Sequence, residues 1–163
     1  MNLEQYSYLA EILGTATVVV SLIYLAVQVR HGIAQGRAEA RYAFVQATSD
    51  INMTIAQDKT LASVWRRGLA NPDELDADET MQLWMLMGQY CNAWMVMHQL
   101  HIDDQLAQNQ WQVVINDVAA ILCTTGGRAF WRMGRGAFDP EFRTFVDDVL
   151  DKGEQPYDML ATS

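Results

Sequence analysis

The stretch ILGTATVVVSLIYLAVQV, residues 12–29, decides the fold of this chain. It contains no charged residue. At 1.5 Å per residue, a helix from Leu9 to Val29 spans about 30 Å, which is the thickness of the hydrocarbon core of a bilayer. Apolar runs in the core helices of soluble proteins are usually shorter, about 10 to 14 residues. We therefore expect a transmembrane helix here.

The residues on either side of this helix predict its fate and direction. Glu4 and Glu11 precede the uncharged run without any Lys or Arg, whereas a cleaved signal peptide needs a positive N-terminal region. Arg30, Arg37 and Arg41 follow it, and positively charged residues stay in the cytoplasm. We expect a permanent anchor, with the N-terminus outside and the C-terminal domain cytoplasmic.

Small side chains recur along one side of the predicted membrane helix. They follow at steps of four, three and four: Ala10, Gly14, Thr17 and Ser21. Small residues allow the backbones of two helices to approach closely, and van der Waals packing drives helix association in lipid. This stripe predicts packing against another membrane helix.

The short N-terminus and the anchor occupy residues 1–30. The chain that follows is expected to be an all-helical soluble domain. Ile33, Ala40 and Ala47 repeat every seven residues, as do Phe44 and Ile51, which indicates a stalk helix continuous with the anchor. The fold class expected is all-α, with one N-terminal transmembrane helix that continues into a long stalk packed with a small antiparallel helical bundle. The expected segments are the domain 31–153, the stalk 31–57, a short helix 60–70, a hairpin 77–124 made of helices 77–101 and 104–123, a short helix 126–134, a last helix 139–152 and a tail 154–163.

Capping signals set several of these boundaries. Asp76 with Glu79 three residues later resembles a capping box, and Asp139 before Pro140 is typical of a helix start. Gly153 is a common helix stop. Thr60 is expected to begin the first short helix, and either Thr124 or Thr125 the second.

The overall composition excludes some classes of function. The formal net charge is -9, and affinity for nucleic acid needs clustered Lys and Arg, so we expect no nucleic-acid partner. The two cysteines, Cys91 and Cys123, are too few for a disulfide framework and lack the CxxC spacing of a zinc site. We expect both to be reduced and buried.

The predicted hairpin is unusual because it is almost uncharged. Within residues 80–124 the only charges are Asp103, Asp104 and Asp117, although a surface helix normally has one charged side. A domain of this size leaves every helix partly exposed, so some of the hairpin is expected to face another chain. The Met and aromatic residues typical of interfaces are Trp84, Met85, Met87, Tyr90, Trp94, Met95, Met97 and Trp111.

Two other interpretations of the hairpin remain open. It could supply a Met-rich core beneath a neutral surface of Gln and Asn. It could also cross the membrane, which we disfavour because residues such as Gln82, Gln89 and Asn92 would bring polar groups into lipid.

No constellation of residues predicts catalysis, a metal or a cofactor. His98 and His101 share one helix face, but a third metal ligand is not evident. His98 lies seven positions after Cys91 on one helix, which places their backbones about 10 Å apart, too far for a nucleophile and its base. Glu11 lies on the far side of the membrane.

The segment TTGGR, residues 124–128, places two glycines at a helix start, where free amides can bind an anion. It lacks the spacing and the lysine of a phosphate loop. Arg128, Arg132 and Arg135 follow one another on one side, and we expect them to pair with acids of the last helix. An anionic lipid headgroup is the alternative partner.

Three stretches together resemble a widespread set of small bacterial membrane proteins of unknown function with one N-terminal span. They are AEILGTATVVVSLIYLAVQVR, SVWRRGLANPDEL and GRAFWRMGRGAFDPEFRTFVDDVL. The resemblance implies a location in the inner membrane of a bacterium, and it brings no catalytic residues with it. The hairpin departs from the usual pattern, which is richer in Arg and Glu. The function expected is a non-enzymatic accessory subunit that docks onto other membrane subunits, with a self-assembling ring or pore as the alternative.

Overall fold

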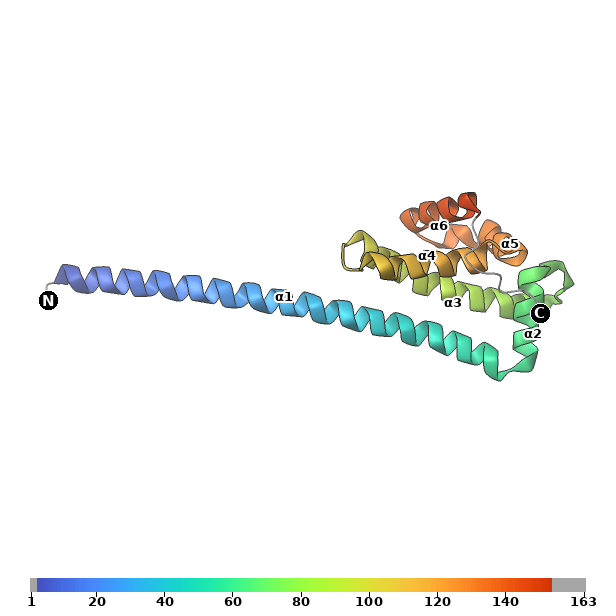
Figure 1. Ribbon diagram of the computed structural model, residues 1–163, viewed down its shortest axis with the longest axis horizontal. Helices are drawn as coiled ribbons and strands as arrows, with labels where there is room; N and C mark the ends of the chain where they lie inside the picture. Colours follow the sequence, from blue (N-terminus) through green and yellow to red (C-terminus); the bar gives the residue numbers. More distant parts are fainter. Residues whose placement is uncertain (1–2, 154–163) are drawn as a thin grey trace. The chain divides into compact units, whose positions relative to one another are not determined.

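The computed structural model describes residues 3–153 of the chain, with the side chains of residues 3–13 and 40 excepted (Figure 1). The described part is all-α, with six α-helices and two 3-10 turns. The chain divides into two compact units, Met1–Tyr42 and Ala43–Ser163. The predicted tail over 154–163 lies outside the described residues.

The first unit is formed by the N-terminal part of α1, a helix of 55 residues from Leu3 to Gln57. Within residues 3–153, α1 from Gly14 on is the one helix long and apolar enough to cross a membrane by itself. A second segment meets the same criterion only when Gln108–Leu122 and Thr125–Ala137 are taken together across a bend of 98°. A long apolar N-terminal helix of this kind could be a membrane span or a signal sequence.

The second unit begins with the C-terminal part of α1. Ile51 is buried, and Phe44, Thr48 and Ile55 are half-buried on the same side, at steps of four, three and four. The predicted heptad pair Phe44 and Ile51 therefore lies on the packed side. Ala47 is exposed, so the other predicted repeat does not form the packed face.

Helix α2, Lys59–Ala70, follows α1 and contributes buried side chains to the core. The N-cap of α2 is Asp58, whose carboxylate accepts hydrogen bonds from the amides of Thr60 and Leu61. The helix therefore begins one residue before Thr60, where the sequence predicted its start. The 3-10 turn η1, Pro72–Glu74, leads into α3, Ala77–Ile102. The capping box of Asp76 and Glu79 is present as predicted.

Helix α4, Gln108–Leu122, begins later than residue 104, where the sequence placed its start. Asp104 has a positive φ of 55°, a conformation that belongs to a turn and not to a helix start. Asp103 and Asp104 therefore end the preceding helix region. Ala107 occupies the cap position without a side-chain hydrogen bond.

Helix α4 contacts α3 and two later helices, α5 (Thr125–Gly134) and α6 (Pro140–Lys152) (Figure 1). Helix α5 is Thr125–Gly134, and its cap is Thr124, whose hydroxyl accepts from the amide of Gly127. After the 3-10 turn η2, Arg135–Ala137, comes α6, Pro140–Lys152. The predicted cap at Asp139 is confirmed, and the helix ends at Gly153 with φ 66°.

Two glycines of α5 allow these helices to pack closely. A Cβ atom on Gly126 would lie 1.9 Å from the carbonyl oxygen of Gly68, so α2 and α5 touch backbone to backbone. A Cβ on Gly127 would lie 2.2 Å from the carbonyl oxygen of Ile121. Both distances are far below van der Waals contact, so only glycine fits at these positions.

Candidate interaction surface and cavities

The apolar part of α1 exposes its side chains. Val20, Ile23 and Tyr24 are typical, with 60 to 65% of each side chain accessible. Polar groups in this part are bonded inside the helix: the Ser21 hydroxyl donates to the carbonyl of Thr17, and the Gln28 amide donates to the Tyr24 hydroxyl, each at 2.8 Å. Such local bonds reduce the cost of placing polar groups in lipid.

The stripe predicted to pack against another membrane helix is described in part. Gly14, Thr17 and Ser21 are exposed on α1, and a Cβ on Gly14 would meet no described atom within 4 Å. The side chain of Ala10 lies outside the described residues. Three of the four positions are thus uncovered within the described chain, and their packing against a second helix stays a prediction.

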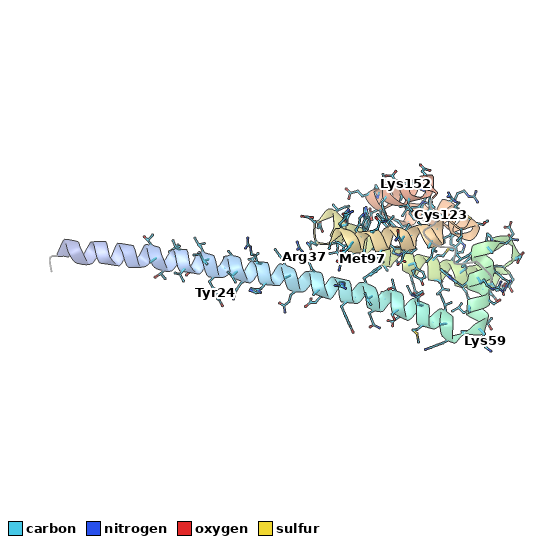
Figure 2. All side chains as sticks on the ribbon, in the orientation of Figure 1. Tyr24, Arg37, Lys59, Met97, Cys123 and Lys152 are labelled. Carbon is cyan, nitrogen blue, oxygen red and sulfur yellow. The ribbon has the colours of Figure 1, made fainter. Side chains whose placement is uncertain are left out.

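The three arginines used to predict the topology follow the apolar part. Arg30, Arg37 and Arg41 are all exposed on α1, and Figure 2 labels Arg37 beyond Tyr24 along this helix. Their exposure is compatible with contact to lipid headgroups. The direction of insertion stays a prediction.

The side chains predicted to form a partner interface fall into two groups. Five of them are buried in the chain's own core, each with 6% of its surface accessible or less: Met87, Tyr90, Trp94, Met97 and Trp111. These five are corrected to core residues, because a helix inside a small bundle turns its largest side chains toward its neighbours. Trp84 and Met95 are half-buried, and Met85 is exposed.

The core positions are connected by aromatic contacts. The rings of Trp65, Tyr90 and Trp94 follow one another with centroids 5.5 Å apart, and the Tyr90 hydroxyl donates to the side-chain oxygen of Asn52 at 2.8 Å. The indole N–H of Trp94 is buried without an acceptor among the described residues. Tyr90 therefore connects α3 to both α1 and α2 inside the second unit.

The Met and aromatic residues selected from the sequence did not identify the outward side of α3. Between Met81 and Gln99, uncharged exposed residues recur at steps of four, four, three, four and three: Met81, Met85, Gln89, Asn92, Val96 and Gln99, called here the α3 stripe. The spacing of Gln89, Asn92 and Gln99 was visible in the sequence and could have located this face. The surface is a neutral one that mixes amides with large apolar side chains.

A cavity of about 330 Å³ lies at one end of the α3 stripe. It lies between the α1–α2 junction and α3, and its lining includes Leu61, Met81 and Met85. Asp58 also lines it, although its carboxylate already caps α2. Met side chains are flexible enough to reshape such a surface around a partner.

The two histidines lie in an aromatic cluster. The His98 ring is 5.0 Å from Phe145 and 5.7 Å from both Trp111 and Phe142, and His101 stacks on Trp111 at 4.3 Å. Within residues 3–153, no three His, Cys, Asp or Glu side chains are placed to hold a metal ion. The predicted face shared by the histidines thus packs against α4 and α6.

Burial governs the pKa of His98. Desolvation lowers this pKa below the ordinary 6.5 and is the largest effect, while the nearby carboxylates of Asp139 and Glu141 raise it and His101 lowers it further. The neutral imidazole is therefore favoured in the folded chain.

The cysteines are both free thiols. Cys91 is buried as predicted, whereas Cys123 is only half-buried. Burial raises the pKa of the Cys91 thiol to about 12, so it is a poor nucleophile at neutral pH. Burial also raises the pKa of Cys123, with Arg128 acting in the opposite direction.

The start of α5 is a packing site and not an open anion site. Gly126 and Gly127 are buried, and the amide of Gly127 is bonded to Thr124. Of the arginines that follow, Arg135 pairs with Asp147 as predicted. The Arg128 guanidinium instead donates to the backbone carbonyl of Leu150 at 3.1 Å.

Comparison with known proteins returned no relative. No protein-family profile, curated protein or solved structure matches this chain.

Proposed function

We propose that this protein is a non-enzymatic accessory subunit, anchored in the inner membrane of a bacterium by α1 and docked onto other membrane subunits through the α3 stripe. The observation that carries the docking is the lack of any charge on the outward side of α3 from Met81 to Gln99. The proposal is narrower than an interface made by the whole hairpin, since five of the side chains first considered are buried in the core.

The anchoring half rests on the first unit. Its apolar side chains, including Val18, Leu22 and Leu25, are accessible along a continuous helix. Burial of apolar area stabilises a protein by about 25 cal/mol per Å², so an apolar helix of this length favours a bilayer over water. Because Ser21 and Gln28 are bonded within the helix, few polar groups oppose insertion.

The docking half rests on the composition of the α3 stripe. Interfaces are depleted in charge at their centre and enriched in Met, and Met81 and Met85 are 57% and 60% exposed. The amides of Gln89, Asn92 and Gln99 in the same stripe keep this surface hydrated in the free subunit and offer hydrogen bonds to a partner. The cavity beside Met85 could receive an apolar anchor side chain.

A matched pair of substitutions tests the docking. Val96 lies in the α3 stripe and Val113 lies on α4, and each is 54% exposed. The experiment purifies the tagged full-length chain from native membranes in a gentle detergent. We expect the chain and its Val113→Lys variant to co-purify with the same partners and the Val96→Lys variant to lose them. Equal behaviour of the two variants would contradict docking through the α3 stripe.

The ring or pore alternative gives a different result in the same detergent. Recombinant protein made without native partners should then form a discrete homo-oligomer, which intact-mass measurement detects. Migration of the native protein as a monomer in every preparation would contradict both forms of assembly.

The orientation is tested separately. Alkaline phosphatase fused after Ser163 is active only outside the cytoplasm, so we expect low activity. Each of Arg30, Arg37 and Arg41 favours the cytoplasmic side by about 1 kcal/mol near anionic lipid. Replacing all three by Gln and adding lysines before Tyr6 should therefore invert a fraction of the molecules and raise the phosphatase activity.

A further inference from the structure

A second cavity, of about 490 Å³, lies wholly within the second unit, and no residue of the α3 stripe lines it. Its walls come from η1, from the N-terminal half of α3 and from α5. The apolar part of the lining includes Leu75, Trp84, Phe130 and Met133. This volume falls in the range of about 300 to 1,000 Å³ that is typical of small-molecule sites.

The apolar wall of this cavity is closely packed on one side, and the exposed Met133 lies on another. Trp84 and Phe130 meet edge to face with ring centroids 5.4 Å apart, and Phe130 is buried. Gly126, also in the lining, holds α5 directly against α2, so the wall cannot retreat. Met133 is 64% exposed and can adjust to what enters.

Two opposite charges line the same cavity from different elements. Asp73 comes from η1 and Arg132 from α5. In the described part of the chain neither side chain makes a hydrogen bond or an ion pair, and they do not pair with each other. Other arginines nearby are already engaged: Arg67 with Glu79 at 2.5 Å, and Arg135 with Asp147.

We propose that this cavity binds a small zwitterion with an apolar body, such as an α-amino acid with a large apolar side chain. The carboxylate of the ligand pairs with the guanidinium of Arg132, whose planar fork suits a carboxylate. The ammonium group pairs with the carboxylate of Asp73. The side chain of the ligand packs on Trp84 and Phe130, which supply apolar surface and carry no charge.

The choice of a zwitterion follows from the balance of charges. A simple anion would gain from Arg132 but would be repelled by Asp73, and a simple cation would meet the reverse. A ligand with both charges satisfies both side chains, and its apolar body displaces water from the aromatic wall. This inference is independent of the docking proposed for the α3 stripe, because the cavity is lined by other residues of α3.

The test uses the full-length chain in detergent and L-phenylalanine as the probe, with affinity measured by calorimetry. Two analogues each lack one charge: phenylalaninamide has no carboxylate, and N-acetylphenylalanine has no ammonium group. We expect saturable binding of L-phenylalanine and binding of each analogue that is weaker by about tenfold, the usual effect of losing one charged hydrogen bond.

Substitutions then assign each charge. In the Arg132→Gln variant, phenylalaninamide should bind as well as L-phenylalanine does. In the Asp73→Asn variant, N-acetylphenylalanine should bind as well as L-phenylalanine does. Arg66→Gln is the matched control, because Arg66 is an exposed arginine of α2 outside the cavity lining. Ala129→Leu, which adds volume to the cavity lining, should weaken every ligand.

Thermal unfolding of each variant shows that the domain is intact before binding is compared. The proposal is overturned if L-phenylalanine does not bind saturably. It is also overturned if binding persists unchanged in both the Arg132→Gln and the Asp73→Asn variants, or if discrimination against the analogues does not follow the substituted charge.

Discussion

The apolar part of α1 and helix α3 are two nearly uncharged segments of one chain with opposite environments. The side chains described in the first unit of α1 are exposed, whereas α3 buries eight residues in the second unit. The polar residues differ in the same way. In α1 the hydroxyl of Ser21 is bonded back to its own helix, and in α3 the amides of Gln89, Asn92 and Gln99 gather on one side. Lack of charge by itself therefore does not indicate which side chains are covered, because such side chains are exposed along α1 and partly buried in α3.

The largest expected effect comes from removing a buried side chain of α3. Trp94→Ala should lower the free energy of unfolding of the second unit by about 3 to 5 kcal/mol, because Trp94 is fully buried. Leu22→Ala, in the apolar part of α1, should leave it unchanged. Urea unfolding followed by near-ultraviolet circular dichroism in mild detergent measures both. Equal effects would mean that the two helices do not differ in packing as described.

Trp94→Phe sharpens the same comparison. The indole N–H of Trp94 has no acceptor among the described residues, and leaving such a group buried costs about 1 to 3 kcal/mol. Removing it offsets part of the loss of packing, so we expect a much smaller loss than for Trp94→Ala. A loss as large as that of the alanine variant would indicate that the N–H is bonded.

The glycines of the two regions should respond differently. Gly126→Ala forces a methyl group against the carbonyl of Gly68 and should cost about 3 kcal/mol. Gly32→Ala, on α1, meets open space in the described chain and should stabilise its helix by up to about 1 kcal/mol. The same urea unfolding measures the first change, and helix content in detergent measures the second.

The pH dependence of stability should be smaller and should belong to the second unit. Because burial holds the pKa of His98 below its ordinary 6.5, the unfolded chain binds this proton more readily than the folded chain does. The contribution of His98 is complete above pH 6.5 and is lost as the pH falls from 6.5 through the lower folded pKa. His98→Phe should flatten this slope between pH 7.5 and 5.5, and His31→Gln should leave it intact. An unchanged slope in His98→Phe would assign the effect to other groups.

The smallest effect concerns thiol reactivity. Cys123 is half-buried, whereas Cys91 is buried with its pKa raised to about 12. In the folded chain at neutral pH, a maleimide should modify Cys123 slowly and Cys91 more slowly still. In denaturant both should react at similar rates, and mass spectrometry of the digested protein distinguishes them. Faster labelling of folded Cys91 would contradict its place in the core.

The sequence by itself determined the all-α class, the long apolar N-terminal helix and most helix ends. These features depend on local chemistry: an uncharged run, the carboxylates of Asp76 and Asp139 on nearby amides, and the left-handed residue Gly153. The start of α4 was misjudged because a turn at Asp104 is as compatible with an acidic residue as a helix cap is.

Only the tertiary structure decided which residues of α3 face inward. The segment is neutral around its whole circumference, so its composition does not indicate which side is exposed to solvent and which is buried. The choice is made by the packing of the second unit, which covers Tyr90, Trp94 and Met97 and leaves Met85 and Val96 outside. The contact of Gly68 with Gly126, and the cavity that joins Asp73 to Arg132, likewise depend on residues far apart in the chain, whose proximity no local pattern encodes.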